Sequence, residues 1–581
     1  MAWAEPITKV EVLELMPQND STSSESPFFA FRVAFVAAIG GFLFGYDLGL
    51  IGATNVYLKD QFQLSDTQLG FATSSAVMGC IFGPFLACWL CDAVGRKPTM
   101  ICASVLLAVS ALATAVPDMI AGSDTETTMF MFNLFRFVGG LGVGLCSIAS
   151  PMYIAESAPP KKRGRMGLMY QLAIVTGHIV APLIAALIAY TLRGSYGVED
   201  GVIPSEASLQ AWRWMFASET VCVLAFVGFV IYLPRSPRWL AEKGRYEEAL
   251  SIMTRIDGAA YAEEEVKEIR AQLEQESGGW REVFSPGIRY ALLIGIMLAF
   301  LNNWTGWSVI GGYIPWLFEM SGLDDRALNI LKFAFAYFVM GLVTLLSLFI
   351  VDVTGRRPLW MFGSLLGALV TFLAGMVFHF EITGGLVLTV IALCTIPHGI
   401  ALGPLPWLMM SELFPTRIRA KALSVTTTFL WVTVFSCSYL FPPLVGFSQT
   451  QLTTTRDVST TTATVSFDDA TPARILDSGG GFLEAGFKPG NRVTVLNATE
   501  PQNRGTFKIE EVKDGELILD PNVRLAKEAA GAEVTLQVGS VGGAFWVFTV
   551  ICILSFFFGL FMMPETKGRT LEEIADSWKK R

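Results

Sequence analysis

Charged side chains are scarce in this sequence. Asp, Glu, Lys and Arg together make up 16% of the 581 residues, whereas hydrophobic residues make up 52%. A soluble globular domain usually has about 25% charged residues. The composition is therefore typical of a membrane protein, and nucleic acid is not among the expected partners.

The residues from which metal sites and active sites are usually built are also few or isolated. The nine cysteines lie in or at the ends of apolar runs, where they serve as small hydrophobic side chains. The one CxxC motif, Cys88–Cys91, has no His or Cys nearby to complete a metal site. Neither a nucleotide-binding loop nor a nucleophile–base set is recognisable, so we expect no metal, no cofactor and no enzyme activity. The three histidines are isolated, and packing is their ordinary role, although His178 has a place in a central cavity as its alternative.

Long apolar runs are what the sequence has in abundance. Each is about 20 residues long, the length that crosses a bilayer as a helix. The twelve runs are approximately 30–54, 67–91, 98–117, 127–153, 166–191, 211–233, 287–317, 329–351, 358–379, 384–411, 421–446 and 541–563. They predict an all-α membrane protein with twelve transmembrane helices.

Positive charges in the short loops alternate from one side to the other. One side carries Arg96 and Lys97, 161–165, Arg356 and Arg357, Arg417 to Lys421, and 579–581, whereas the loops 117–128 and 379–384 carry none. Loops rich in Lys and Arg stay in the cytoplasm. We therefore expect a multi-pass protein of the plasma or inner membrane with both termini and the 234–286 loop cytoplasmic. Residues 1–26 are polar and acidic, and we expect no signal peptide.

Two loop motifs occur twice. Residues 92–98, DAVGRKP, recur as 352–358, DVTGRRP, at an offset of 352 − 92 = 260. Residues 156–164, ESAPPKKRG, recur as 412–420, ELFPTRIRA, at an offset of 412 − 156 = 256. The nearly constant offset indicates two six-helix repeats, which in transporters enclose a substrate site near the bilayer midplane.

The repeated motifs combine tight turns with charges of both signs. Glycine permits the turn, and arginine forms strong paired bonds with carboxylates at neighbouring helix ends. We interpret them as a cytoplasmic gate that latches the two halves. For Lys97, Lys161 and Lys162 a role in topology alone is the favoured alternative. The candidate gate residues are Asp92, Gly95, Arg96, Glu156, Arg163, Glu219, Asp352, Gly355, Arg356, Glu412 and Arg419.

Two opposite charges lie inside apolar runs of the first half. Charges at membrane depth are costly, so they usually have a function there. Burial of Asp47 favours its protonated form, whereas a nearby Arg136 favours the charged form. We predict that Asp47 and Arg136 form a proton switch; a permanent structural ion pair is the alternative.

The motifs together resemble the sugar porters of the major facilitator superfamily, and are most similar to bacterial sugar–proton symporters. The resemblance covers nearly the whole chain except 448–540 and the N-terminal tail. It rests on GYD at 45–47, DxxGR at 92–96, RFVGG at 136–140, PMYIAE at 151–156, PRSPRW at 234–239, GPxxW…SELFP at 403–415 and PETKGRTL at 564–571. It implies a twelve-helix fold with rocking halves, a cytoplasmic helical domain at 234–286, and proton coupling through Asp47, which passive facilitators of the family typically lack.

The resemblance also implies a sugar site. A sugar needs amides that donate and accept hydrogen bonds, and an aromatic platform for its ring. The positions that match the family's sugar contacts are Gln171, Asn302, Asn303, Ser308 and Trp407, with Trp304 and Trp307 as further candidates. The sequence departs from the family at 302–308, NNWTGWS, where two Gln, a Gly and an Asn are usual, at Leu430, where a polar contact is usual, and at Arg235, commonly Glu.

Residues 448–540 form an insert between the last two apolar runs. Short alternating runs at 463–467, 491–497, 505–512, 516–520 and 532–538 are separated by turn residues. We predict a small all-β barrel or sandwich outside the membrane, preceded by a Thr-rich linker at 452–462. A spacer and a glycan- or partner-binding module are both open as its function.

We thus expect a secondary active transporter that moves a sugar or polyol with protons by alternating access. The alternatives are a carrier of another small polar metabolite and a transceptor that senses a ligand through its outer β domain. The expected partners are the substrate, protons, the lipid bilayer and an unknown ligand of the β domain. The predicted divisions are 1–27 N-terminal tail, 28–233 first six helices, 234–286 helical linker, 287–447 helices seven to eleven, 448–540 β insert, 541–563 last helix and 564–581 C-terminal tail.

Overall fold

The structure of the protein is a computed structural model. It describes residues 27–122, 124–158, 163–195, 210–274, 279–321, 323, 325–380, 382, 384–414, 418–447, 449–453, 464–485, 487–496, 498–503, 505–521, 523–530, 534–539 and 542–567. The predicted N-terminal tail up to residue 26, the loop residues Lys161, Lys162 and Arg417, most of the Thr-rich linker and the tail from 568 onward lie outside the described residues. The side chains of Arg163, Asp352 and Arg419 also lie outside them.

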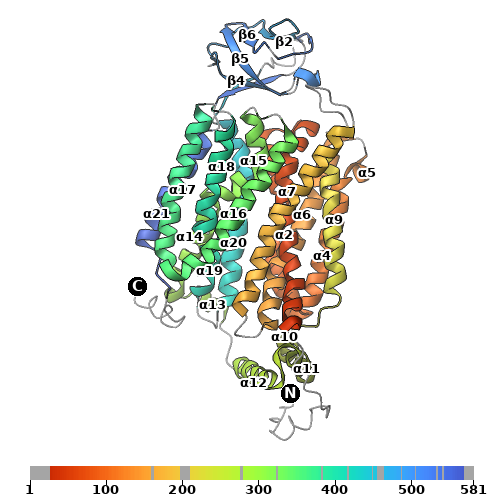
Figure 1. Ribbon diagram of the computed structural model, residues 1–581, viewed down its shortest axis with the longest axis vertical. Helices are drawn as coiled ribbons and strands as arrows, with labels where there is room; N and C mark the ends of the chain where they lie inside the picture. The colour runs from red at the N-terminus through yellow and green to blue at the C-terminus, as the bar shows by residue number, and fades with distance from the viewer. Residues whose placement is uncertain are drawn as a thin grey trace.

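Twelve spans in the described residues are long and apolar enough to cross a membrane, which confirms the predicted fold class. The first half contains α2 (Pro27–Phe62), α3 (Asp66–Ala93), α4 (Arg96–Ala115), α6 (Thr125–Ser157), α7 (Arg163–Ser195) and α9 (Ala211–Val230). The second half contains α14 (Pro286–Trp304), α15 (Trp307–Met320), α16 (Arg326–Thr354), α17 (Arg356–His379), α18 (Gly385–Pro397), η1 (His398–Leu402), α19 (Pro404–Glu412), α20 (Arg419–Phe447) and α21 (Gly542–Phe561). The helices stand side by side in one bundle (Figure 1).

Two spans of the second half are broken. The seventh span divides into α14 and α15 at Thr305 and Gly306, and Gly306 has a φ of 108°, which a residue with a side chain rarely adopts. The tenth span passes through the π-helix η1 between α18 and α19, next to Pro397 and Gly403. Breaks of this kind free backbone carbonyls inside a bundle, and in transporters they mark the substrate site.

Helices of the first half approach each other closely through glycine. A Cβ on Gly140 of α6 would lie 1.7 Å from the Ala76 carbonyl oxygen of α3, and one on Gly83 would lie 2.5 Å from the Gly144 Cα. Small residues permit such close backbone contact in membrane helices. The first half is therefore a tightly packed unit around its charged residues.

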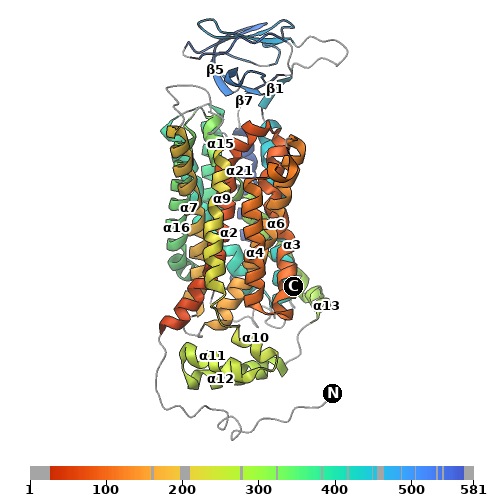
Figure 2. The same ribbon diagram turned by 90° about the vertical axis from the view of Figure 1, so that its right-hand side faces the viewer.

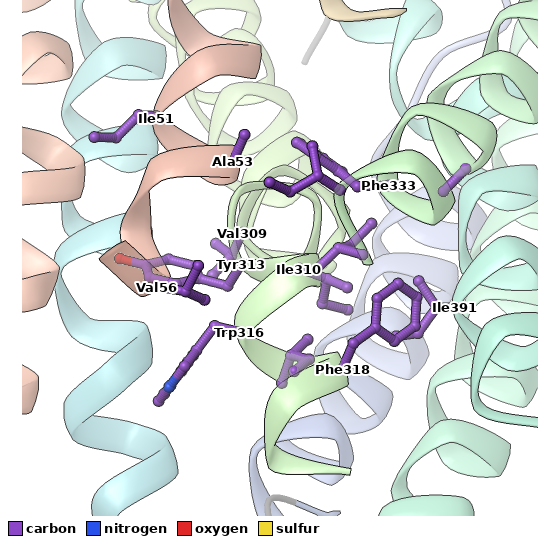
Figure 3. Packing of buried hydrophobic residues seen from close by; sticks show 14 of the residues in the cluster. Ile51, Ala53, Val56, Val309, Ile310, Tyr313, Trp316, Phe318, Phe333 and Ile391 are labelled. Atoms are coloured by element: carbon purple, nitrogen blue, oxygen red, sulfur yellow. The ribbon is translucent and has the colours of Figure 1, made fainter. Parts of the chain in front are cut away.

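The two halves meet along an apolar seam. Helix α2 packs against α15, α3 against α20, and α7 against α16. Figure 3 shows buried side chains from α2, α15, α16 and α18 interdigitating in this seam. They are Ile51, Ala53, Val56, Val309, Ile310, Tyr313, Trp316, Phe318, Phe333 and Ile391.

Small domains cover the two ends of the bundle. The 234–286 linker forms α10 (Pro237–Glu242), α11 (Tyr246–Asp257), α12 (Ala259–Glu274) and α13 (Trp280–Val283). A separate four-residue helix, α5 (Asp118–Ala121), lies between α4 and α6. Helices α10 to α12 share a core of their own that includes Trp239, Leu240 and Met253. Figures 1 and 2 place these helices at one end of the bundle and the β strands at the other. We name these ends the linker face and the β face.

The insert folds into an antiparallel sheet with its own hydrophobic core. Its seven strands run in the order β1-β7-β4-β5-β6-β3-β2. They are β1 (Gln449–Thr453), β2 (Val465–Asp468), β3 (Arg474–Asp477), β4 (Arg492–Leu496), β5 (Gly505–Lys513), β6 (Glu516–Leu519) and β7 (Thr535–Gly539), with the short helix η2 (Pro501–Asn503) before β5. Phe467, Ile475, Phe487, Val493 and Leu517 are among the side chains of its core. The prediction of a small all-β insert is thus confirmed.

Sequence reasoning missed two of these strands. β3 has only four residues, and β1 is rich in Gln and Thr with little apolar alternation, so neither shows a clear strand pattern. β1 directly follows α20, β7 directly precedes α21, and the two strands pair from Gln449 with Gly539 to Thr453 with Thr535. The chain therefore leaves and re-enters the bundle through one two-stranded ladder.

Candidate functional site

The first half holds a buried ion pair at mid-depth. Asp47 on α2 and Arg136 on α6 are each 1% exposed, and Arg136 Nη1 donates a hydrogen bond to Asp47 Oδ1. The guanidinium also lies 5.2 Å from the ring centre of Phe216 on α9. Breaking such a pair by removing one partner leaves an uncompensated buried charge, which is strongly unfavourable. The predicted partners of the proton switch are therefore in contact.

Glu219 joins this pair and is not part of a gate at the helix ends. Sequence reasoning assigned Glu219 to the cytoplasmic gate, but it lies in the middle of α9, is 2% exposed, and interacts electrostatically with Asp47 and Arg136. Asp47 Oδ2, Glu219 Oε1 and two guanidinium nitrogens of Arg136 have no hydrogen-bond partner among the described residues. One guanidinium faces two carboxylates here, so the cluster has one acid more than it has bases. The gate prediction failed for Glu219 because spacing along the sequence does not give depth in the bundle.

The two predicted amides brace the broken helices. Asn302 Nδ2 donates to the carbonyl oxygens of Leu402 at 2.7 Å and Gly403 at 3.3 Å, both at the break in the tenth span. Asn303 Nδ2 donates to Ala299 O at 3.1 Å and Thr433 Oγ1 at 3.0 Å. Both side chains are almost fully buried. Their donors thus satisfy the protein's own acceptors in this structure.

The other predicted substrate residues differ in exposure. Trp407 on α19 is 42% exposed, while Gln171 on α7 and Ser308 on α15 are half-buried. Trp304 stacks on Phe300 at 5.5 Å between ring centres, in the packing role that is ordinary for a membrane aromatic. Gln171, Ser308 and Trp407 therefore keep exposed surface, as does Trp304, whereas Trp307 is almost fully buried.

Trp307 belongs to a group of rings that the sequence did not reveal. The His178 ring on α7 stacks on Tyr337 of α16 at 4.9 Å, which joins the two halves. Trp307 lies 5.7 Å from Tyr337 and 6.5 Å from His398, measured between ring centres. His398 Nδ1 is buried, and no described residue forms a hydrogen bond with it. His178 stood out in the sequence, but nothing in the pattern around Tyr337 or His398 distinguished them from ordinary apolar-span residues.

At the linker face, the duplicated motifs form the same bonds twice. Arg96 Nη2 lies 2.6 Å from Glu156 Oε1, and Arg356 Nη2 lies 2.9 Å from Glu412 Oε1. Each arginine follows a glycine with φ near 90°, which turns the chain into α4 or α17. The geometry makes each repeat a fixed contact between two helix ends.

A hydroxyl completes each of these contacts. Ser236 Oγ donates to Glu156 Oε2, and Thr566 Oγ1 donates to Glu412 Oε2 at 2.6 Å. These hydroxyls belong to a third repeat, PRS at 234–236 and PET at 564–566, with an offset of 564 − 234 = 330. The spacing in the sequence does not reveal this pairing, because the β insert lengthens the offset.

In this structure the gate contacts stay within each half. Arg96 and Glu156 both belong to the first half, and Arg356 and Glu412 both belong to the second. The Asp92 side chain is exposed, and its carbonyl accepts a bond from Trp239 Nε1. The ion pairs described for Arg96 and Arg356 therefore each lie within one half and stiffen it.

Comparison with family models matches residues 33–462 and 531–578 to a family described as sugar (and other) transporter. The gap between the two matched segments falls within the β insert. The matched residues include all of the helices that carry the charged cluster, the amides and both gate motifs.

Individual proteins agree with this match. The chain is 33% identical over 434 residues to the arabinose-proton symporter of Bacillus subtilis (strain 168), which covers 74% of this chain and 89% of that protein. It is 31% identical over 433 residues to the D-xylose-proton symporter of Escherichia coli (strain K12), and this match covers 71% of this chain and 85% of that protein. The solved inward open conformation of the xylose transporter XylE from E. coli superimposes with a TM-score of 0.68 at 26% identity, over 94% of this chain and 100% of that chain.

Proposed function

Because the chain belongs to the sugar (and other) transporter family, we propose that it is a secondary active transporter that carries a sugar or polyol together with a proton by alternating access. The observation that supports this most directly is the buried cluster of Asp47, Arg136 and Glu219. Membrane charges of this kind serve proton relays in transporters. The similarity to an arabinose-proton symporter and a D-xylose-proton symporter points the same way.

The coupling step follows from the charges. When Asp47 takes up a proton, its attraction to Arg136 falls, and the guanidinium is left to Glu219 on α9. The contact between α2 and α6 then weakens while that between α6 and α9 strengthens. A proton on Asp47 thereby favours one arrangement of the first-half helices over another, which is how a ligand biases a two-state element.

Substrate binding follows from the broken spans of the second half. Asn302 ties the end of α14 to the break in the tenth span, and Asn303 ties it to Thr433 of α20. Gln171, Ser308 and Trp407 offer polar and aromatic surface. Amides and indoles suit a polyhydroxylated ring with weakly apolar faces. A sugar bound between the halves would link the charged first half to the broken helices of the second.

We further propose that the linker face is cytoplasmic and that the β face is outside. The support is the positive charge around the linker face, at Arg96, Lys97, Arg356 and Arg357, against the loops 117–128 and 379–384 of the other face, which carry no Lys or Arg. This places the β insert outside the cell, where a spacer is its simplest role.

A carrier of a different small polar metabolite is the second candidate. The observation that favours it is the commitment of both Asn302 and Asn303 donors to backbone and hydroxyl acceptors. A site with fewer free amides discriminates less strongly for a densely hydroxylated ligand. The two candidates differ only in substrate.

Uptake into proteoliposomes tests both. The purified chain is reconstituted and offered radiolabelled pentoses, hexoses, polyols and small polar metabolites that are not carbohydrates, with and without an inward proton gradient. We expect saturable uptake of at least one sugar or polyol, with accumulation above equilibrium only when the gradient is present. Uptake of a polyol or sugar that ignores the gradient would refute proton coupling, and uptake restricted to non-carbohydrate metabolites would establish the second candidate.

A further inference from the structure

At the β face, one arginine bridges the two halves. Arg326, the first residue of α16, lies between Asp60 near the end of α2 and Glu319 near the end of α15. Its Nη2 donates to Asp60 Oδ2, and its Nε donates to Glu319 Oε1 at 2.7 Å. The guanidinium also lies 5.1 Å from the ring centre of Tyr57 on α2. Asp60 belongs to the first half and Glu319 to the second, so the arginine joins them.

Neighbouring contacts reinforce this junction. Asn55 on α2 donates to the Gly312 carbonyl of α15 at 2.9 Å and accepts from Thr73 Oγ1 at 3.0 Å. The Lys59 ammonium lies 4.9 Å from the ring centre of Trp316. The outer ends of α2 and α15 are thus held by hydrogen bonds and cation–π contacts as well as by the apolar seam below (Figure 3).

The opposite face lacks a matching bridge among the residues described. There, the two gate arginines pair with carboxylates of their own halves. Among ion pairs between described side chains, Arg326–Asp60 is the one that joins the first half to the second. Among the described side chains, the ionic contact between the halves therefore lies at the β face in this state.

We propose that Asp60, Arg326 and Glu319 form a clasp that closes the transport path at the β face, and that opening toward that face requires the Asp60–Arg326 bond to break. Glu319 is the positioning residue, because it orients the guanidinium from within the second half. The inference rests on the proposed alternation between two access states. The clasp sets the balance between those states before any substrate binds.

A buried thiol reports on the clasp without requiring transport. Ala53 lies in the seam between α2 and α15 and is fully buried (Figure 3). We would introduce Ala53→Cys after replacing the three native cysteines that are not buried, Cys88, Cys102 and Cys222, by Ser. The measurement is the rate at which a membrane-impermeant maleimide modifies position 53 in purified protein, relative to the same background with Ala53 intact.

Breaking the bond between the halves should raise the modification rate. Asp60→Asn and Arg326→Gln should each accelerate modification of position 53 at least about fivefold. This is the lower end of typical coupling between two states, and we expect the lower end because a partly exposed ion pair contributes less than a buried one. Glu319→Gln removes only the bond within the second half, so its effect should be smaller. The exchange Asp60→Arg with Arg326→Asp, made together with Glu319→Gln so that the new carboxylate on α16 does not face a second one on α15, restores an opposite-charge pair. It should return the rate toward that of Glu319→Gln alone.

The chain offers a closely matched control. Arg213 on α9 pairs with Asp118 on α5 at 2.6 Å, and its side chain is 19% exposed, as is that of Arg326. The carboxylates are also similar, at 47% exposed for Asp118 and 43% for Asp60. Both members of the control pair belong to the first half. Arg213→Gln should therefore leave the modification rate of position 53 unchanged.

Two outcomes would overturn the clasp. One is a rate that Arg326→Gln changes no more than Arg213→Gln does. The other is a failure of the charge exchange to slow modification relative to the single variants, which would show that they merely loosen the fold. Because the thiol assay needs no substrate, a chain that fails to transport any sugar but shows the expected rates would refute the proposed function and leave the clasp standing.

Discussion

The two halves of the bundle are alike at the linker face and different at mid-depth. Both halves repeat an arginine, a glutamate and a hydroxyl: Arg96, Glu156 and Ser236 in the first, Arg356, Glu412 and Thr566 in the second. At mid-depth the first half carries three buried charges, whereas the second carries amides and broken helices. The two repeats thus share the contacts that stiffen each half. They differ at mid-depth, where we propose that the first half handles the proton and the second half contributes to substrate binding.

A second difference lies beside the matching motifs. In the second half, Glu565 accepts hydrogen bonds from the amides of Arg356 and Arg357, both at 3.1 Å, where α17 begins. In the first half the equivalent residue is Arg235, which lies over the Trp239 ring, and the indole of Trp239 covers Gly95. A carboxylate at a helix N-terminus is favourable, whereas an arginine there is not. The first-half motif is therefore the less stabilised of the two.

Removing the charge that distinguishes the first half should have the largest effect. Asp47→Asn keeps the size of the side chain but cannot release a proton, so we expect accumulation driven by a proton gradient to be abolished. Exchange of substrate down its own gradient should remain measurable. The measurement is uptake by proteoliposomes with and without the gradient.

The control for Asp47→Asn is Asp118→Asn, which neutralises a half-exposed carboxylate of the same half away from the cluster. It should accumulate substrate as the unaltered chain does. If Asp47→Asn still concentrates substrate against a gradient, the proton passes through another group and the proposed division between the halves is wrong.

The second prediction separates ligand contacts from braces. Gln171→Ala should weaken substrate affinity about 5- to 150-fold, the equivalent of about 1–3 kcal/mol for an unpaired polar partner, with little change in thermal stability. Asn303→Ala should chiefly lower thermal stability, since it deprives Ala299 O and Thr433 Oγ1 of a donor. Binding and melting measurements on both variants check this. Equal effects of the two variants on affinity would make Asn303 a ligand contact in the transporting protein.

How far sequence reasoning reached depends on the kind of feature. Length and hydropathy were sufficient for the twelve spans, since the bilayer fixes the length of each, and loop repeats were sufficient for the two halves. Asp47 and Arg136 were found because charges in apolar runs are rare. Glu219 was misplaced and Tyr337 was missed because neighbours across the bundle are set by packing, which no local spacing records.

The third prediction tests the unequal helix starts. Burial opposes ionisation of Glu565, but hydrogen bonds from the amides of Lys567, Arg356 and Arg357 outweigh it, so its pKa lies below the usual value. A carboxyl whose pKa is lowered by folding stabilises the fold above its unfolded pKa of about 4.3, and this is lost as pH falls through the folded value. Glu565→Gln should therefore lower stability by about 0.5–1 kcal/mol at pH 7 and by progressively less below pH 4.

The reciprocal variant sharpens this comparison. Arg235→Glu places a carboxylate at the equivalent position of the first half, but Trp239 already covers Gly95, so the gain should be smaller than the loss in Glu565→Gln. Thermal melting between pH 3.5 and pH 7 measures both. A loss in Glu565→Gln that does not vary with pH would show that the charge of Glu565 is not what stabilises the start of α17.

The smallest effect is expected from the largest deletion. β1 and β7 already hold the ends of α20 and α21 together, and Leu452 pairs directly with Leu536. Replacing 453–535 by Asn-Gly should close this ladder with a two-residue hairpin turn. The rest of the sheet has its own core, built around Phe467, Phe487 and Val493, so its removal exposes no seam of the membrane bundle.

Uptake per molecule of protein in the membrane should stay within about twofold, since closing a much shorter loop changes the closure entropy by only about 0.6 kcal/mol per halving. A well-folded, shortened chain that no longer transports would show that the β domain takes part in opening the β face or in delivering substrate to it, and would favour a sensing role over that of a spacer.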